Sequence, residues 1–149
     1  MMKNLSRVVW SEGMYLAPHH FQVQSRYFED SIQFTASALC YAPYGFAGFG
    51  LDAEALRNGT LSLLHARGIL PDGLAFQMPD CDALPEARNI ADLFPPTRDK
   101  VTVLLAIPEH RLNGANCAQS GDEGGWVRYL AESRTIADET TGRDEKTVP

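Results

Sequence analysis

The stretch Trp10–Phe28, "WSEGMYLAPHHFQVQSRYF", decides how the chain begins to fold, because an irregular arm gives way to a helix within it. Pro18 suits the first turn of a helix, where its missing N–H costs no hydrogen bond. Apolar residues then recur at helical spacing as far as Leu39. The sequence therefore predicts an N-terminal arm over residues 1–17 and a helix over about 18–39.

The predicted helix carries two apolar stripes. One stripe contains Phe21, Ser25, Phe28, Ile32, Thr35 and Leu39, and the other contains Val23, Tyr27, Ser31, Phe34 and Ala38. A helix that lies on one small core needs a single apolar stripe. The second stripe indicates either another covering surface, such as a second subunit, or a neighbouring loop of the same domain, and both remain open.

From Tyr41 onward the sequence consists of short runs separated by turn signals. The run "ALRNGTLSLLHARGILPDGLAFQMP", residues 55–79, predicts successive strands with turns at Asn58-Gly59 and at Pro71-Asp72-Gly73. The β-branched run Lys100–Pro108 predicts a strand buried on both faces. One helix followed by many short strands predicts a mainly β fold, a β-sandwich over about 41–149 with an N-terminal α-helix, in one domain over 1–149.

The C-terminal part of the sequence is more polar. Residues 113–125 are rich in glycine and predict a mobile loop, and residues 126–142 alternate well enough for one or two strands. The last ten residues, "TTGRDEKTVP", have no helix cap and no apolar partner. They indicate a flexible tail or a chain cut where a larger protein continues.

Composition and charge exclude several classes of function. A hydrophobic content of 44%, with 21% charged residues, is ordinary for one globular domain of 149 residues. The net charge of −6 and the lack of a basic run argue against nucleic acid. No segment predicts a signal peptide or a membrane-spanning helix, and three widely spaced cysteines predict no disulfide framework. We therefore expect a cytoplasmic protein without direct membrane insertion.

No residue pattern converges on catalysis, a cofactor or a metal. His19 and His20 diverge by about 100° on a helix and cannot chelate one ion as an i, i+4 pair does. Gly45, Gly48 and Gly50 do not follow the order of a phosphate-binding loop, and a following strand is expected, so tight backbone packing is the better interpretation. We expect no enzyme, although a hydrolase that uses a cysteine or a histidine remains an alternative.

The cysteines divide into two environments. Cys40 closes the apolar helix and is expected to be buried, whereas Cys81 and Cys117 lie in loop-like segments beside acidic residues. Acidic neighbours raise the pKa of a thiol and so disfavour a nucleophile.

The opening stretch resembles the signature of the TssK family, a baseplate component of bacterial type VI secretion. The family pattern runs approximately W-x-E-G-M-x-L-x-P-x-H-F-Q-x-Q, and the segment Trp10–Gln24 matches each fixed position. Residues 58–79 resemble the hairpin region of the family, and "LLAIPEHR", Leu104–Arg111, resembles its next core strand. The resemblance covers most of the chain.

The resemblance implies a fold, partners and a location. It implies a domain similar to the shoulder of phage receptor-binding proteins, without the helical neck and the head that follow in the family. It also implies a homotrimer that docks on the TssF–TssG wedge, in the cytoplasm at the inner face of the inner membrane. Such a domain is a structural adaptor that acts by binding alone.

Two groups of residues are candidates for these contacts. Tryptophan, tyrosine and methionine are enriched at protein interfaces, so the candidate partner-binding residues are Trp10, Met14, Tyr15 and Leu16. The candidates for self-association or core packing are Phe21, Tyr27, Phe28, Ile32 and Phe34. The arm residues could instead pack under their own domain. A further alternative is a ligand- or carbohydrate-binding module with a pocket lined by Tyr41, Tyr44 and Phe46.

Overall fold

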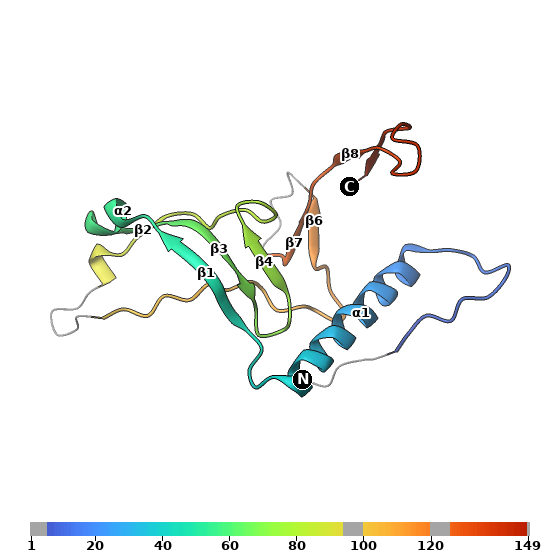
Figure 1. Cartoon of the computed structure of the whole chain (residues 1–149), viewed down its shortest axis with the longest axis horizontal. Coiled ribbons are helices and arrows are strands. Elements are labelled where there is room, and N and C mark those ends of the chain that lie inside the picture. Colours follow the sequence, from blue (N-terminus) through green and yellow to red (C-terminus); the bar gives the residue numbers. More distant parts are fainter. Residues whose placement is uncertain (1–5, 94–99, 120–125, 149) are drawn as a thin grey trace. The chain divides into compact units, whose positions relative to one another are not determined.

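The computed structural model describes residues 6–93, 100–119 and 126–148 (Figure 1). These residues divide into two compact units, one that ends at Val101 and one that begins at Thr102. The elements of the first unit are α1 (Pro18–Leu39), β1 (Gly45–Leu51), α2 (Ala53–Arg57), β2 (Thr60–Leu61), β3 (Leu63–Ile69), β4 (Ala75–Met78), β5 (Arg88–Asn89) and the 3-10 turn η1 (Ala91–Leu93). The strands of the second unit are β6 (Cys117–Gln119), β7 (Tyr129–Ala131), β8 (Arg134–Ile136) and β9 (Lys146–Val148).

Helix α1 begins and ends where the sequence predicts. Pro18 occupies its first turn, and the residue before it, Ala17, has an extended backbone. The Nδ1 atom of His20 accepts a hydrogen bond from the backbone N–H of Ala17 at 3.1 Å, so the histidine closes the start of the helix as a capping-box residue does. The helix stops at Cys40, whose backbone is extended.

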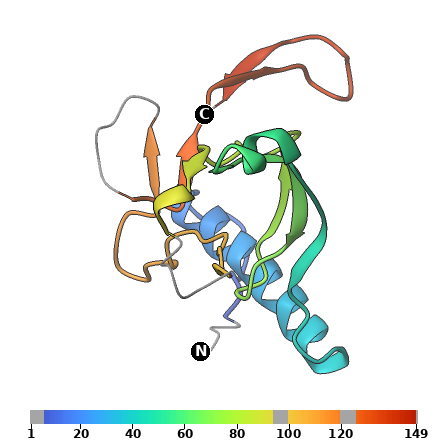
Figure 2. The same cartoon turned by 90° about the vertical axis from the view of Figure 1, so that its left-hand side faces the viewer.

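Strands β1, β3 and β4 form an antiparallel sheet with β3 in the centre (Figure 2). The turn between β3 and β4 is the predicted Pro71-Asp72-Gly73 turn. The N–H of Leu70 donates to the carbonyl oxygen of Leu74 at 2.8 Å, and Gly73 has a φ of +92°, which favours glycine. This part of the sequence prediction is confirmed.

The core of the first unit is small. Among the described residues only Ala66, Phe76 and Ile90 are buried. The ring of Phe46 meets the ring of Phe76 edge-on, with the centroids 5.7 Å apart. A Cβ added at Gly68 would lie 2.9 Å from Cζ of Phe76 and would also clash with the backbone oxygen of Gly45. Glycine at position 68 therefore lets β3 approach its neighbours closely.

The Asn58-Gly59 pair does not form the predicted hairpin turn. The preceding residues form the short helix α2, because the carboxylate of Asp52 caps it by accepting from the backbone N–H groups of Glu54 and Ala55. Asn58 is the C-cap and Gly59 follows it with a φ of +78°, the usual place of a glycine after a helix. Strand β2 then pairs with β5.

The three glycines of the first strand have different roles. Gly45, Gly48 and Gly50 lie within β1, and the next element is the helix α2 rather than the expected strand. The predicted tight packing is found at Gly50, where an added Cβ would lie 2.6 Å from Nε2 of His65. At Gly45 the backbone conformation, with a φ of +131°, is what requires glycine.

In the second unit, β6 and β7 pair in parallel and β8 pairs with β9 in antiparallel fashion. The prediction of one or two strands within residues 126–142 is confirmed by β7 and β8. The prediction of an irregular loop over 113–125 is wrong at Cys117–Gln119, which form β6, and residues 120–125 lie outside the described part. Within the last ten residues, for which the sequence indicates a flexible tail or a cut chain, Lys146–Val148 form β9 and pair with β8.

The predicted buried strand over Lys100–Pro108 is wrong. The described structure assigns no strand to this run, and the side chain of Leu104 is 81% exposed. A β-branched run becomes a strand only when another strand supplies its hydrogen bonds. None of the strands in the described ranges pairs with it.

Candidate interaction surface

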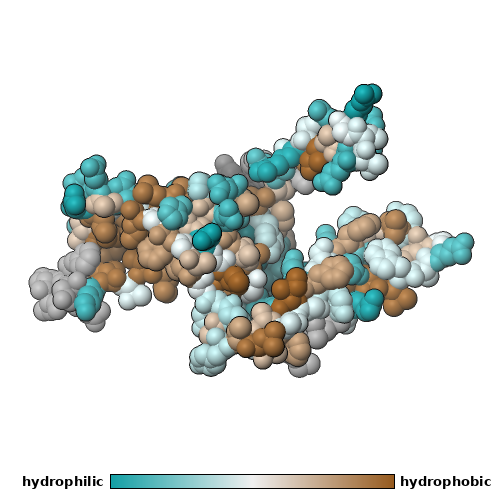
Figure 3. All heavy atoms as spheres, in the orientation of Figure 1, coloured by the Kyte–Doolittle hydropathy of each residue, from teal (hydrophilic) through white to brown (hydrophobic). Residues whose placement is uncertain are grey.

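Helix α1 has no buried residue along its 22 residues. The apolar members of its first stripe are all exposed, with exposed fractions of 55% for Phe21, 55% for Phe28, 70% for Ile32 and 79% for Leu39. Phe34, from the second stripe, is exposed as well. Apolar residues reach the surface along this helix (Figure 3). The helix therefore leaves much more apolar surface uncovered than a helix of a self-sufficient core does.

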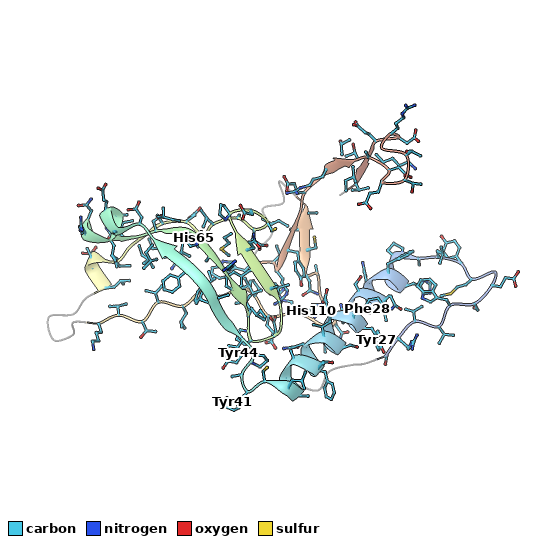
Figure 4. All side chains as sticks on the ribbon, in the orientation of Figure 1. Tyr27, Phe28, Tyr41, Tyr44, His65 and His110 are labelled. Carbon is cyan, nitrogen blue, oxygen red and sulfur yellow. The ribbon has the colours of Figure 1, made fainter. Side chains whose placement is uncertain are left out.

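The other side of α1 contacts the rest of the first unit. The side-chain amide of Gln33 donates to the carbonyl oxygen of Pro71 at 3.1 Å, next to the turn between β3 and β4. The guanidinium carbon of Arg7 lies 5.8 Å from the centre of the Tyr27 ring, a cation–π contact between the arm and the helix. Figure 4 shows Tyr27 and its neighbour Phe28 on α1. Only Tyr27, of these two, is half-buried.

The arm turns back on itself before the helix begins. The N–H of Met14 donates to the carbonyl oxygen of Ser11 at 3.3 Å, and Gly13 has a φ of +76° within this turn. The ring of Trp10 lies 5.9 Å from that of Phe21 and 6.2 Å from that of His20. Trp10 thus packs on the first turns of α1 while it keeps 49% of its surface exposed.

The end of the arm projects its apolar side chains. Tyr15 is 86% exposed and Leu16 is exposed, whereas Met14 is half-buried. The structure therefore brings the candidates Trp10 and Phe21 together and leaves Tyr15 and Leu16 without cover. These residues and the exposed stripe of α1 are the candidate interaction surface.

Two positioning residues were not assigned these roles from the sequence. One is Arg7, which lies on Tyr27, and the other is His20, which closes the start of α1. The sequence signal for His20 is its position three residues after Ala17, the residue before Pro18. The second member of a capping box occupies that position. No sequence signal pairs an arm arginine with a helix tyrosine.

The described residues assemble no metal-binding cluster. Within them, no cluster of three or more histidine, cysteine, aspartate or glutamate side chains has the geometry to hold a metal ion. The three cysteines are free and exposed, so the prediction that Cys40 is buried is wrong. Cys40 follows the last residue of α1 and lines an open hollow rather than a packed core. None of the helices in the described ranges is both long and apolar enough to cross a membrane.

A hollow of about 320 Å³ lies between the second half of α1 and the segment that follows it. Tyr41 and Tyr44 line this hollow (Figure 4), but Phe46 does not, because its ring packs on Phe49 and Phe76. The only polar side chains of the lining, apart from cysteine and tyrosine, belong to Gln33 and Ser37, and Gln33 is already bonded to Pro71. Saccharide sites bring several polar groups together. The hollow therefore gives little support to the carbohydrate-binding alternative.

The sequence of this chain matches that of known proteins of bacterial type VI secretion. Residues 20–149 match a family profile described as Bacterial Type VI secretion, with the names EvfL, ImpJ and VasE. Over 141 residues, 95% of this chain, the sequence is 33% identical to the type VI secretion system baseplate component TssK1 of Pseudomonas aeruginosa strain PAO1. The chain spans 31% of that relative's length.

Solved structures of TssK also align with this chain. A crystal structure of TssK aligns with 97% of this chain and 32% of its own length, at a TM-score of 0.80 and 30% identity. The TssK–TssF–TssG baseplate subcomplex, determined by cryo-electron microscopy, aligns with 97% of this chain and 47% of the matched chain, at a TM-score of 0.80 and 23% identity. The predicted fold class, a mainly β fold of the sandwich type with an N-terminal helix, is confirmed by the match to the TssK crystal structure.

Proposed function

Because the chain belongs to the TssK family of bacterial type VI secretion proteins, we propose that it is a structural adaptor domain of the secretion baseplate. Its partners in this proposal are other copies of itself, in a homotrimer, and the baseplate proteins TssF and TssG. Its place is the cytoplasmic baseplate at the inner membrane. The observation that carries the proposal is the exposed apolar surface of α1 and the arm.

The adaptor acts by binding and not by catalysis. Some large apolar side chains remain in water in a single chain. When a partner covers them, the free energy of the system falls by about 25 cal/mol for each Å² of apolar surface removed from water. The described residues offer many such side chains on α1 and the arm, whereas Phe76 and Ile90 are the only large apolar side chains buried among them. We further propose that both units belong to one domain over residues 1–149, which the partners complete.

The arm is the proposed contact with the wedge. Tyr15 and Leu16 project from a turn that Gly13 and the Met14–Ser11 hydrogen bond fix. Trp10 holds this turn against α1 through Phe21 and His20. Exposed aromatic residues on a fixed turn are the kind of anchor that dominates the energy of protein interfaces.

The test replaces Met14 and Tyr15 by alanine and measures binding to the TssF–TssG complex by titration. We expect the double variant to keep its circular dichroism spectrum and to bind about tenfold more weakly or worse, the loss typical of an interface anchor. The matched control is Leu64→Ala, an exposed apolar residue of β3 away from the arm. Undiminished binding by the double variant would exclude the arm as the wedge contact.

A further inference from the structure

His20 connects the arm to the start of α1. Its Nδ1 atom accepts a hydrogen bond from the backbone N–H of Ala17 at 3.1 Å, and its own backbone N–H donates to the carbonyl oxygen of Ala17 at 3.0 Å. The centre of its ring lies 6.2 Å from that of Trp10. The side chain of His20 is half-buried, whereas that of His19 is exposed. One histidine therefore binds the last residue of the arm and also faces the tryptophan of the arm.

The bond to Ala17 exists only while Nδ1 carries no proton. A neutral imidazole has one N–H donor and one acceptor nitrogen, whereas both nitrogens of an imidazolium are donors. Protonation of His20 would bring two N–H donors together and leave the N–H of Ala17 without its acceptor. It would also place a positive charge in the first turn of α1, where the helix dipole disfavours cations. Both effects weaken the attachment of the arm to the helix.

The charged groups nearest to His20 in the sequence of the arm and of α1 do not compensate such a charge. The arm carries Arg7, which is held in a cation–π contact further along α1, and Glu12, which is exposed. On α1, His19 is adjacent, and the next charged residue is Arg26, almost two turns away. Within the described ranges His20 forms no ion pair. No carboxylate of these ranges therefore holds the imidazolium in place.

The direction of the exposed side chains of the arm depends on this bond. Tyr15 and Leu16 come directly before Ala17, and both are exposed. Ala17 has an extended backbone, with a φ of −127° and a ψ of 154°, and its N–H is bound by His20. The bond therefore fixes the direction in which Tyr15 and Leu16 leave the helix. Because histidine changes its charge between about pH 5 and 8, this direction is sensitive to pH.

We propose that His20 is a positioning residue that makes the docking of the arm on the TssF–TssG complex dependent on pH. Neutral His20 holds Tyr15 and Leu16 in the docking conformation, and protonated His20 releases the arm from the start of α1. The stabilisation is present at high pH and is lost as the pH falls. This inference rests on the arm contact of the proposed function and adds the group that controls this contact.

The first test measures binding to the TssF–TssG complex by titration at about pH 7.5 and at about pH 5.5, between which histidine changes its charge. We expect the wild-type chain to bind about tenfold more weakly at the lower pH. His20→Gln keeps an acceptor at the capping-box position and cannot be protonated, so it should lose much less. The matched control is His19→Gln, which should keep the pH dependence of the wild type. Because TssF and TssG also titrate, the comparison between these variants isolates His20.

A third variant, His20→Leu, removes the acceptor at every pH. It should bind at the higher pH about as weakly as the wild type does at the lower pH, and His20→Gln should restore the binding. Equal pH dependence in the wild type and in His20→Gln overturns the inference. In that case a weakened Met14→Ala, Tyr15→Ala double variant keeps the arm contact and discards only the role of His20. An undiminished double variant discards both.

The second test observes the arm without its partners. In an acid titration of the chain by nuclear magnetic resonance, the amide proton of Ala17 and the ring protons of Trp10 should shift with the same midpoint as the ring protons of His20. These shifts should disappear in His20→Gln and persist in His19→Gln. An Ala17 amide proton that does not follow the protonation of His20 overturns the inference.

Discussion

At the scale of single residues, the carboxylate of Asp138 organises the turn between β8 and β9. Its Oδ1 atom accepts hydrogen bonds from the backbone N–H groups of Thr140 at 2.7 Å and of Thr141 at 3.2 Å. These bonds favour the ionised form and lower the pKa of Asp138 below its ordinary value. The stabilisation is therefore complete above the ordinary pKa of an aspartate and is lost as the pH falls through the lowered value.

We predict that the amide protons of Thr140 and Thr141 shift together in an acid titration followed by nuclear magnetic resonance. The midpoint should lie below the usual pKa of aspartate, because the two N–H groups bind the carboxylate. In Asp138→Ala these shifts should disappear. A midpoint at or above the ordinary aspartate value would contradict the hydrogen-bonded turn.

Gly68 and Gly48 provide a matched pair of substitutions in one sheet. A Cβ at Gly68 would clash with the ring of Phe76 and with the backbone of Gly45, and neither group can move aside easily. A Cβ at Gly48 meets only the flexible side chain of Arg67, at 3.6 Å. We predict that Gly68→Ala lowers the free energy of unfolding by about 1–3 kcal/mol. Gly48→Ala should change it by much less, as urea denaturation of both variants will show.

At the scale of elements, α1 is the helix whose surroundings matter most for function. Phe28 and Ile32 are exposed within one chain, so a charge at either position disturbs no core. We predict that Phe28→Asp or Ile32→Asp abolishes self-association, because the charge would be buried at the interface, and leaves the helical signal in place. Ser37→Asp is the control. Sedimentation that finds the same oligomer, with unchanged melting, would remove this helix from the interface.

The elements that the sequence predicts correctly are those that local signals define. Pro18 marks the start of α1, and Pro71-Asp72-Gly73 marks the turn between β3 and β4. Helix α2 also had local signals, an aspartate cap at Asp52 and a glycine at position 59, but the Asn58-Gly59 pair is a hairpin signal too. The two interpretations differ in whether the residues before the pair form a helix or a strand. Capping by Asp52 decides this in favour of the helix.

The strand predicted over Lys100–Pro108 is absent for a different reason. Its composition favours a strand, and its local propensity is not in doubt. A strand depends on a neighbouring strand, and the run itself does not reveal that neighbour. None of the described strands pairs with residues 100–108. Sequence reasoning therefore predicts α1 and the hairpin well and predicts pairing between distant segments poorly.

At the scale of the whole molecule, the motif from Trp10 to Gln24 predicted more than any single element did. The family that it indicated is confirmed by the match over residues 20–149 and by the relative from Pseudomonas aeruginosa. The roles of Trp10, Met14, Tyr15 and Leu16 stay predictions. Whether such residues pack inward or bind a partner depends on other chains, which no single sequence contains.

The exposed apolar surface supports the proposal that copies of this chain and baseplate neighbours cover the arm and α1. The most direct measurement is the mass of this 16.4-kDa chain in solution, alone and mixed with TssF and TssG, by analytical ultracentrifugation. We expect a homotrimer that sediments with TssF and TssG. A 16.4-kDa monomer at every concentration, unchanged by TssF and TssG, would contradict it.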